Sequence, residues 1–160
     1  MTVHRPSNVD DPADVARLIT AIGEAARGLP VVFPVHPRTA KTLTTPPFRP
    51  ACLLAVEPQP YQELNYLMCH ARGVTTDSGG IPKETTVLGI PSMTLRNSTK
   101  RSETVTLGTN DLIGTGPAAL KPAPDKRFAG QKKKGTVPDL CDGRTDERVA
   151  AILERQLARG

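Results

Sequence analysis

The sequence predicts an α/β fold, in which helices cover both faces of a mostly parallel sheet, giving a three-layer αβα domain. Short apolar segments rich in β-branched residues alternate with helix-like segments along the chain. These apolar segments lack the polar–apolar alternation of a half-exposed sheet, which is typical of strands buried on both faces. A chain of 160 residues accommodates one such domain and is too short for two of ordinary size.

The first half of the chain predicts three strands separated by helices. The chain begins inside a strand at residues 1–3, and Asp11 with Pro12 then supplies an N-cap and a first helical residue. Gly28 ends this helix. The apolar positions at helical spacing are Val15, Leu18, Ile19 and Ile22. Further strands are predicted at 31–35 and 53–56, a short or broken helix within the proline-rich stretch 42–50, and a helix at 61–71.

The second half continues the alternation and ends in a long tail. Strands are predicted at 73–76, 92–95 and 112–113, a helix at 81–88 closed by Gly89, and a polar loop at 96–103. The tail is predicted to hold a basic surface loop at 126–142 and an amphipathic helix at 144–158 that packs back on the domain. Residues 1–160 are therefore predicted to form a single domain.

The amino-acid composition and the charge limit which residues can build the core and which partners the chain is predicted to bind. Aromatic residues are few, so the core is predicted to consist of Val, Ile, Leu and Ala. The net charge of +5 comes partly from Lys132–134. A basic run can bind nucleic acid, but no aromatic residues interleave with it to stack bases, so a solvated surface is the preferred interpretation. No nucleic-acid partner is predicted.

The cysteines and the hydropathy pattern predict a reduced, cytoplasmic protein without a membrane segment. Cys52, Cys69 and Cys141 form no CxxC pair, which argues against a disulfide framework or a zinc knuckle. Cys52 and Cys69 lie in apolar stretches and are predicted to be buried thiols. No apolar run of membrane-spanning length and no signal peptide is recognisable.

Ligands of parallel α/β sheets bind beyond the carboxyl ends of the strands, so the polar residues after each strand are the candidates. These are residues 4–5, 36–38, 57–59, 77–80, 96–103 and 114–115. His36 and Arg38 are predicted to brace their loop. The three histidines lack the spacing of a metal set, and neither GxGxxG nor GxxxxGK[ST] is present. No metal site is therefore predicted.

The stretch TTDSGGIPKE at 75–84 carries the most specific chemistry. Gly79 and Gly80 lack Cβ atoms and let a ligand approach the backbone, while Ser78 offers a hydroxyl. The following helix start presents free N–H groups to an anion. Glu84, one turn later, can accept hydrogen bonds from ribose hydroxyls, as acidic residues do in other nucleotide sites. A nucleotide site and a capped strand-to-helix turn are both compatible with this pattern.

Several ordered motifs resemble the C-terminal half of the non-hydrolysing UDP-N-acetylglucosamine 2-epimerases. They are HRPSNVD (4–10), VFPVHPRT (32–39), EPQPY (57–61), TDSGGIPKE (76–84), GIPSMTLRNSTKRSE (89–103), GT (108–109) and DGRTDERV (142–149). The resemblance covers nearly the whole chain in the expected order. It implies half of a GT-B-like fold built from two Rossmann-like domains, with the active site between them and the N-terminal domain absent from this chain.

The resemblance implies a reaction that needs no metal or redox cofactor. UDP-N-acetylglucosamine loses UDP to leave a 2-acetamidoglucal, and UDP adds back with inversion at C2 to give UDP-N-acetylmannosamine. The implied ligands are thus UDP and UDP-N-acetylglucosamine. Ser78, Gly79 and Gly80 would bind the diphosphate, and Glu84 the ribose hydroxyls.

The remaining residues that the resemblance assigns surround the base and the leaving group. Gln59 and Leu64 would lie near the uracil, while Arg101 and the catalytic His4 would complete the charge around the departing UDP. The acid–base carboxylates belong to the N-terminal domain in this family. The chain is therefore expected to be inactive alone, and to act as a homodimer or with the missing domain.

The sequence also departs from the family pattern. Ser7 stands where Glu is usual in HRxEN, Pro82 and Lys83 replace Gln and Glu after SGGI, and Lys100 replaces the Glu before Arg101. Two acid-to-lysine changes near one cleft alter its field. The alternatives left open are the nucleotide-binding half of a GT-B glycosyltransferase and a non-catalytic UDP-binding module.

Overall fold

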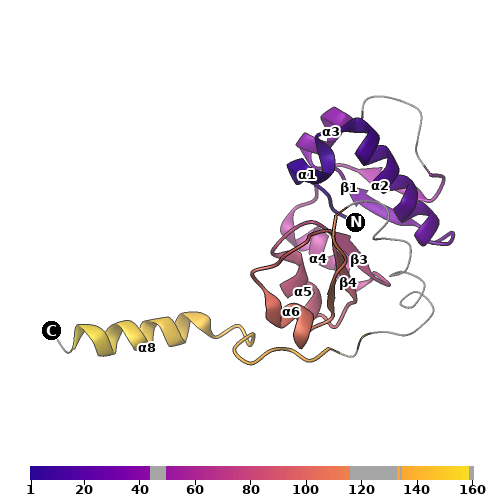
Figure 1. Ribbon diagram of the computed structural model, residues 1–160. Coiled ribbons are helices and arrows are strands. Elements are labelled where there is room, and N and C mark those ends of the chain that lie inside the picture. Colours follow the sequence, from indigo (N-terminus) through magenta and orange to yellow (C-terminus); the bar gives the residue numbers. More distant parts are fainter. Residues whose placement is uncertain (44–49, 116–132, 134, 159–160) are drawn as a thin grey trace.

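The computed structural model describes residues 1–43, 50–115, 133 and 135–158, and it confirms the predicted α/β fold with parallel strands (Figure 1). The strands are β1 Val31–Pro34, β2 Leu53–Val56, β3 Val74–Thr76, β4 Ser92–Thr94 and β5 Asn110–Leu112. The helices are α1 Pro6–Val9, α2 Pro12–Ala25, α3 Pro37–Thr42, α4 Tyr61–Cys69, α5 Ile81–Val87, α6 Ser102–Thr106 and α8 Thr145–Leu157.

The N-terminal segment, residues 1–3, joins two groups of parallel strands. β1 pairs with β2, and β3, β4 and β5 pair in that order. On one side of the segment the N–H of Thr2 donates to the carbonyl of Thr75 at 2.9 Å. On the other side the amino group of Met1 donates to the carbonyl of Val32 at 2.5 Å. The resulting order, β2–β1–segment 1–3–β3–β4–β5, is the doubly wound Rossmann order, whose switch point lies between residues 1–3 and β3.

The apolar core lies around helix α2. The predicted N-cap is confirmed, because the Asp11 carboxylate accepts a hydrogen bond from the Ala13 N–H at 2.7 Å. The four apolar positions predicted for this helix are all buried. They pack with Val3, Phe33 and Leu95, of which the last two are fully buried.

The core beside β4 and β5 is polar, which corrects the prediction of a core made from Val, Ile, Leu and Ala. Asn110 is fully buried, and its Oδ1 accepts from the hydroxyls of Thr94 at 2.7 Å and Ser92 at 3.2 Å. Its Nδ2 donates to the Thr104 hydroxyl at 3.3 Å. The network satisfies the buried polar atoms of these residues, so short polar side chains fill the space that apolar ones occupy elsewhere.

Three short helices were not predicted. α1, α3 and α6 span four to six residues each, too few for an apolar periodicity to become visible. Local contacts define them instead: the His36 ring caps α3 by accepting the Arg38 N–H at 3.1 Å. The last strand begins two residues earlier than predicted, at Asn110, because a buried asparagine in a strand reads as a loop residue in sequence.

Helix α8 forms where predicted but does not pack back on the domain (Figure 1). It projects away from the sheet, and none of its residues is buried. Its apolar face remains exposed and consists of Val149, Ile152, Leu153 and Leu157. Ion pairs from Arg144 to Glu147 and from Arg148 to Asp142 hold its first turn locally.

Two further predictions about single residues are wrong. Cys69 is exposed and Cys52 is half-buried, so neither is a buried thiol. Lys133 is half-buried rather than solvated, and its Nζ donates to the main-chain carbonyls of Asn110, at 3.0 Å, and of Val105. Residues 126–132 and 134 of the predicted loop at 126–142, which include Lys132 and Lys134, lie outside the described residues. No helix in the described part of the chain has the length and apolarity needed to cross a bilayer.

Candidate functional site

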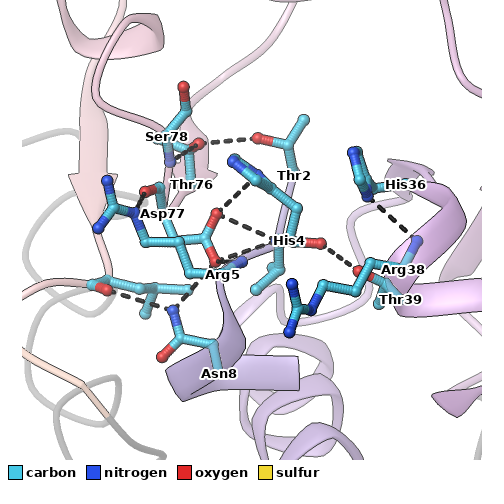
Figure 2. A network of polar contacts seen from close by, with 12 residues as sticks. Thr2, His4, Arg5, Asn8, His36, Arg38, Thr39, Thr76, Asp77 and Ser78 are labelled. Carbon is cyan, nitrogen blue, oxygen red and sulfur yellow. Dashed lines mark hydrogen bonds and ion pairs between the residues drawn. The ribbon is translucent and has the colours of Figure 1, made fainter. Parts of the chain in front are cut away.

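The candidate site lies at the switch point of the sheet, where the loop after residue 3 meets the loop after β3 (Figure 2). Both loops leave the carboxyl ends of neighbouring parallel strands, since Thr2 bridges Thr76 in parallel. In open α/β sheets this crevice is the place where ligands bind.

Asp77 joins the two loops. Its carboxylate is fully buried and accepts the main-chain N–H of His4, at 3.0 and 3.1 Å, and that of Arg5 at 2.8 Å. The amide of Asn8 donates to the same carboxylate at 3.0 Å, and Nε of Arg5 donates to the Asp77 carbonyl at 3.0 Å. Buried carboxylates require such partners, so Asp77 fixes residues 4–8 against the end of β3.

The His4 ring belongs to the same cluster. Its Nδ1 lies 3.0 Å from Oδ1 of Asp77, and the side chain remains 38% exposed. The ring also lies beside that of His36, with centroids 5.4 Å apart. His4 therefore has one nitrogen engaged with a buried carboxylate while part of the ring faces solvent.

The glycine loop 78–80 continues from β3 into α5. The Ser78 N–H donates to the Thr76 hydroxyl at 3.0 Å, and the Ser78 hydroxyl accepts the Gly80 N–H at 3.2 Å. Gly80 has φ −89°, so conformational freedom does not explain the glycine. A Cβ on Gly80 would meet only the Ser78 hydroxyl oxygen, in ordinary contact at 3.9 Å, whereas a Cβ on Gly79 would lie 3.3 Å from a guanidinium nitrogen of Arg96. The loop thus presents bare backbone beside a cation.

Charged side chains without protein partners lie beside this loop and at the starts of helices α5 and α6. Glu84 lies half-buried in the first turn of α5, and Arg101 is exposed at the N-cap of α6. Within the described part of the chain, no hydrogen bond or ion pair engages the Glu84 carboxylate or the guanidinium groups of Arg96 and Arg101. Arg96 beside the glycine loop and Glu84 in the helix that follows it can hold a ligand that carries both anionic and hydroxyl groups.

Two predicted residues lie apart from this loop. Leu64 on α4 lines an apolar cavity of about 360 Å³, together with residues of α2 and β1. Gln59 donates from Nε2 to the Glu57 carbonyl at 2.7 Å. Neither residue contacts the cluster formed by His4, Arg5, Asn8 and Asp77. The roles of Gln59 and Leu64 near the uracil therefore stay predictions.

His36 and Arg38 brace their loop, as expected. The guanidinium of Arg38 binds the Asp10 carboxylate, with Nε 2.9 Å from Oδ1, and this hydrogen bond raises the pKa of Arg38. The Thr39 hydroxyl donates to the Val3 carbonyl at 2.6 Å. These contacts tie α3 to the segment that carries His4. Among the described residues, no cluster of three or more His, Cys, Asp or Glu side chains is arranged to hold a metal ion.

The sequence analysis placed Asp77 and Arg96 among the candidate positions after strands but assigned no role to either, and it missed Asn8 as part of the cluster. All three lie within motifs of the family resemblance, but a sequence does not distinguish a buried acid from a solvated one. The nearest signal was the pairing of HRxxN with TDSGG, which places donors on one loop and an acceptor on the other.

A doubly wound sheet with a glycine loop at its switch point defines the class of Rossmann-like α/β domains. The sequence profile of the UDP-N-acetylglucosamine 2-epimerase family matches residues 1–154. The chain belongs to this family.

Relatives with known names are similar over most of the chain. The UDP-N-acetylglucosamine 2-epimerase of Methanocaldococcus jannaschii is 31% identical over 160 residues, covering 96% of this chain and 43% of its own length. The UDP-2,3-diacetamido-2,3-dideoxy-D-glucuronate 2-epimerase of Pseudomonas aeruginosa is 36% identical over 114 residues, covering 71% and 32%. The chain thus spans under half the length of these relatives.

Solved structures of the family share the fold. The M. jannaschii enzyme in complex with UDP-GlcNAc and UDP matches with a TM-score of 0.81 and 30% identity, over 96% of this chain and 44% of that one. The Neisseria meningitidis enzyme bound to UDP-GlcNAc matches with a TM-score of 0.79 and 25% identity, over 96% and 43%. The fold is therefore that of slightly less than half of such an enzyme, as expected for one half of a GT-B-like protein.

Proposed function

We propose that this chain is the UDP-holding part of a UDP-N-acetylglucosamine 2-epimerase, an isomerase that works by elimination and re-addition of UDP. The observation that carries the proposal is the meeting of the His4 loop and the glycine loop 78–80 at the switch point. It is supported by solved relatives that hold UDP-GlcNAc and UDP.

The proposed roles follow from charge and geometry. The diphosphate lies on Ser78, Gly79 and Gly80, where the backbone is bare and the hydroxyl of Ser78 is close. Arg96, beside Gly79, and Arg101 neutralise its charge. This assigns Arg96 a role alongside the residues predicted from sequence.

The ribose is proposed to bind Glu84. Its carboxylate lies in the first turn of the helix that follows the glycine loop, so phosphate and sugar hydroxyls of one nucleotide can be met together. A carboxylate accepts from both hydroxyls of a ribose, and the unpaired state of Glu84 leaves its oxygens available.

The chemistry assigned to this chain is stabilisation of the leaving group. Breaking the anomeric C–O bond places negative charge on the diphosphate, and donors fixed where charge develops are usually the largest catalytic contribution. The elimination also needs a base near C2, which the resemblance assigns to the other part of the enzyme. We therefore propose that catalysis requires a second domain, supplied by a partner or by a longer polypeptide.

The UDP moiety of the proposed substrate is common to the relatives, whereas the sugar differs between them. The P. aeruginosa relative is named for a different sugar on the same nucleotide. N-acetylglucosamine is proposed here because the relative that matches 96% of the chain is named for it. The non-catalytic UDP-binding module predicted as an alternative shares the same nucleotide site and differs in whether turnover occurs.

Calorimetric titration with UDP and with UDP-N-acetylglucosamine tests the site. The wild-type chain should bind both, and Glu84→Ala should weaken binding by about tenfold or more, since a hydrogen bond to a charged group contributes roughly 1.5–3 kcal/mol. Glu63→Ala is the matched control, because Glu63 is exposed in the first turn of α4. Equal affinities in all three proteins would remove Glu84 from the site. Release of UDP from UDP-N-acetylglucosamine by the chain alone would contradict the need for a second domain.

A further inference from the structure

We propose that Asp77 is a positioning residue, which holds the His4 imidazole in the tautomer that carries a proton on Nδ1 and leaves Nε2 for the ligand. The effect of this tautomer on UDP rests on the proposed function, because the family resemblance assigns His4 to the departing UDP. Its structural basis is independent of any ligand and lies in the contacts of the Asp77 carboxylate (Figure 2).

Every partner of the Asp77 carboxylate other than the His4 ring is a fixed donor. The N–H groups of His4 and Arg5 and the amide nitrogen of Asn8 can donate but cannot accept. A fully buried oxygen pair that collects donors is held as an acceptor. Nδ1 of His4 lies 3.0 Å from Oδ1, and two unprotonated acceptors at that distance would repel each other, so we place a hydrogen on Nδ1.

The state of Nε2 follows from this. In the neutral imidazole only one nitrogen carries a proton, so Nε2 has a free lone pair and can take a proton. In the imidazolium both nitrogens donate, and Nε2–H can give a hydrogen bond or a proton to an oxygen of the leaving diphosphate. Asp77 then faces the positive ring, as the third group of a catalytic triad does.

The substitution Asp77→Asn has a defined effect because of this arrangement. An amide NH₂ placed on the Oδ2 side would face the donors of Arg5 and Asn8. On the Oδ1 side it would face Nδ1 of His4 and the main-chain N–H of His4, and the oxygen at the Oδ2 position can still accept that N–H. His4 is the partner able to change from donor to acceptor, so the NH₂ group takes that side. The proton of His4 then moves to Nε2, and the variant reverses the tautomer.

Nitrogen-15 and carbon-13 NMR of the histidine rings, at a pH where they are neutral, tests this directly. His4→Gln identifies the His4 signals among the three histidines. The wild-type chain should show His4 with the proton on Nδ1, Asp77→Asn should show it on Nε2, and Asp10→Asn should leave it unchanged because Asp10 is exposed and contacts Arg38. A wild-type His4 with its proton on Nε2 overturns the proposal even if Asp77→Asn fails to fold.

A parallel UDP titration separates this inference from the proposed function. Asp77→Asn should bind UDP about tenfold more weakly than wild type and Asp10→Asn equally well. Nδ1 protonation without any UDP binding would support the positioning role and remove the UDP site. UDP binding by a wild-type chain whose His4 carries its proton on Nε2 would support the UDP site and overturn the positioning role.

Discussion

When the polypeptide begins with a free amine at Met1, that buried amino group makes the stability of the chain depend on pH in a way that can be calculated. The group donates to the Val32 carbonyl at 2.5 Å inside the sheet. Burial lowers its pKa from 8.0 to about 5, because a charged ammonium loses its hydration there. The unfolded chain therefore binds a proton below pH 8 that the folded chain does not bind until about pH 5.

The sign and size follow from linkage. Where the unfolded state holds more protons, stability rises with pH, so the chain should lose stability as pH falls from 8 to 5. A shift of about three units at about 1.4 kcal/mol each gives a loss of about 4 kcal/mol across this window. That is a large share of a typical domain stability of about 5–15 kcal/mol.

Urea unfolding of the chain with a free Met1 amine, measured at several pH values from 5 to 8, is the assay. The control is the same chain acetylated at Met1, which cannot carry the charge. Both proteins share all other titrating groups, so the difference between their pH slopes isolates the amine. The free-amine chain should show the steeper rise toward pH 8. Parallel slopes would refute the reasoning that burial excludes the charged form.

Two further predictions concern stability. Asn110→Ala should destabilise the domain by about 3 kcal/mol in urea unfolding, because the buried hydroxyls of Ser92 and Thr94 lose their acceptor. The control is Asn97→Ala, which should change stability little because Asn97 is exposed. Equal effects of the two substitutions would mean that the polar network contributes nothing to stability. Replacing Ile152 and Leu153 of α8 by Ser should alter unfolding by less than about 0.5 kcal/mol, since both are more than half exposed; Ile22→Ser is the buried control, and a comparable loss in the α8 variant would show that this helix does pack on the domain.

Much of the fold could be predicted because local patterns and tertiary packing agree. Strand β2 and helix α2 follow from apolar runs, an N-cap and helical spacing, and the structure confirms them. The prediction failed where a pattern depends on a partner. Helix α8 has a clear apolar face, but amphipathicity indicates only that some surface covers that face. The described part of this domain does not cover it.

The candidate site was predictable in place but not in its internal contacts. The order of strands and the glycines after β3 locate it at the switch point. The role of Asp77 was hidden, because the partners of its carboxylate, on His4, Arg5 and Asn8, lie about seventy positions earlier in the chain. Arg96 was hidden for the same reason, as its closeness to Gly79 arises from the pairing of β3 with β4.

The most direct measurement is a map of backbone amide chemical shifts during titration with UDP. The account predicts that the largest changes occur at Ser78, Gly79, Gly80 and Glu84, with smaller changes at His4. Changes confined to the apolar cavity, at Leu67 and Met68 of α4, with none in the glycine loop, would contradict it.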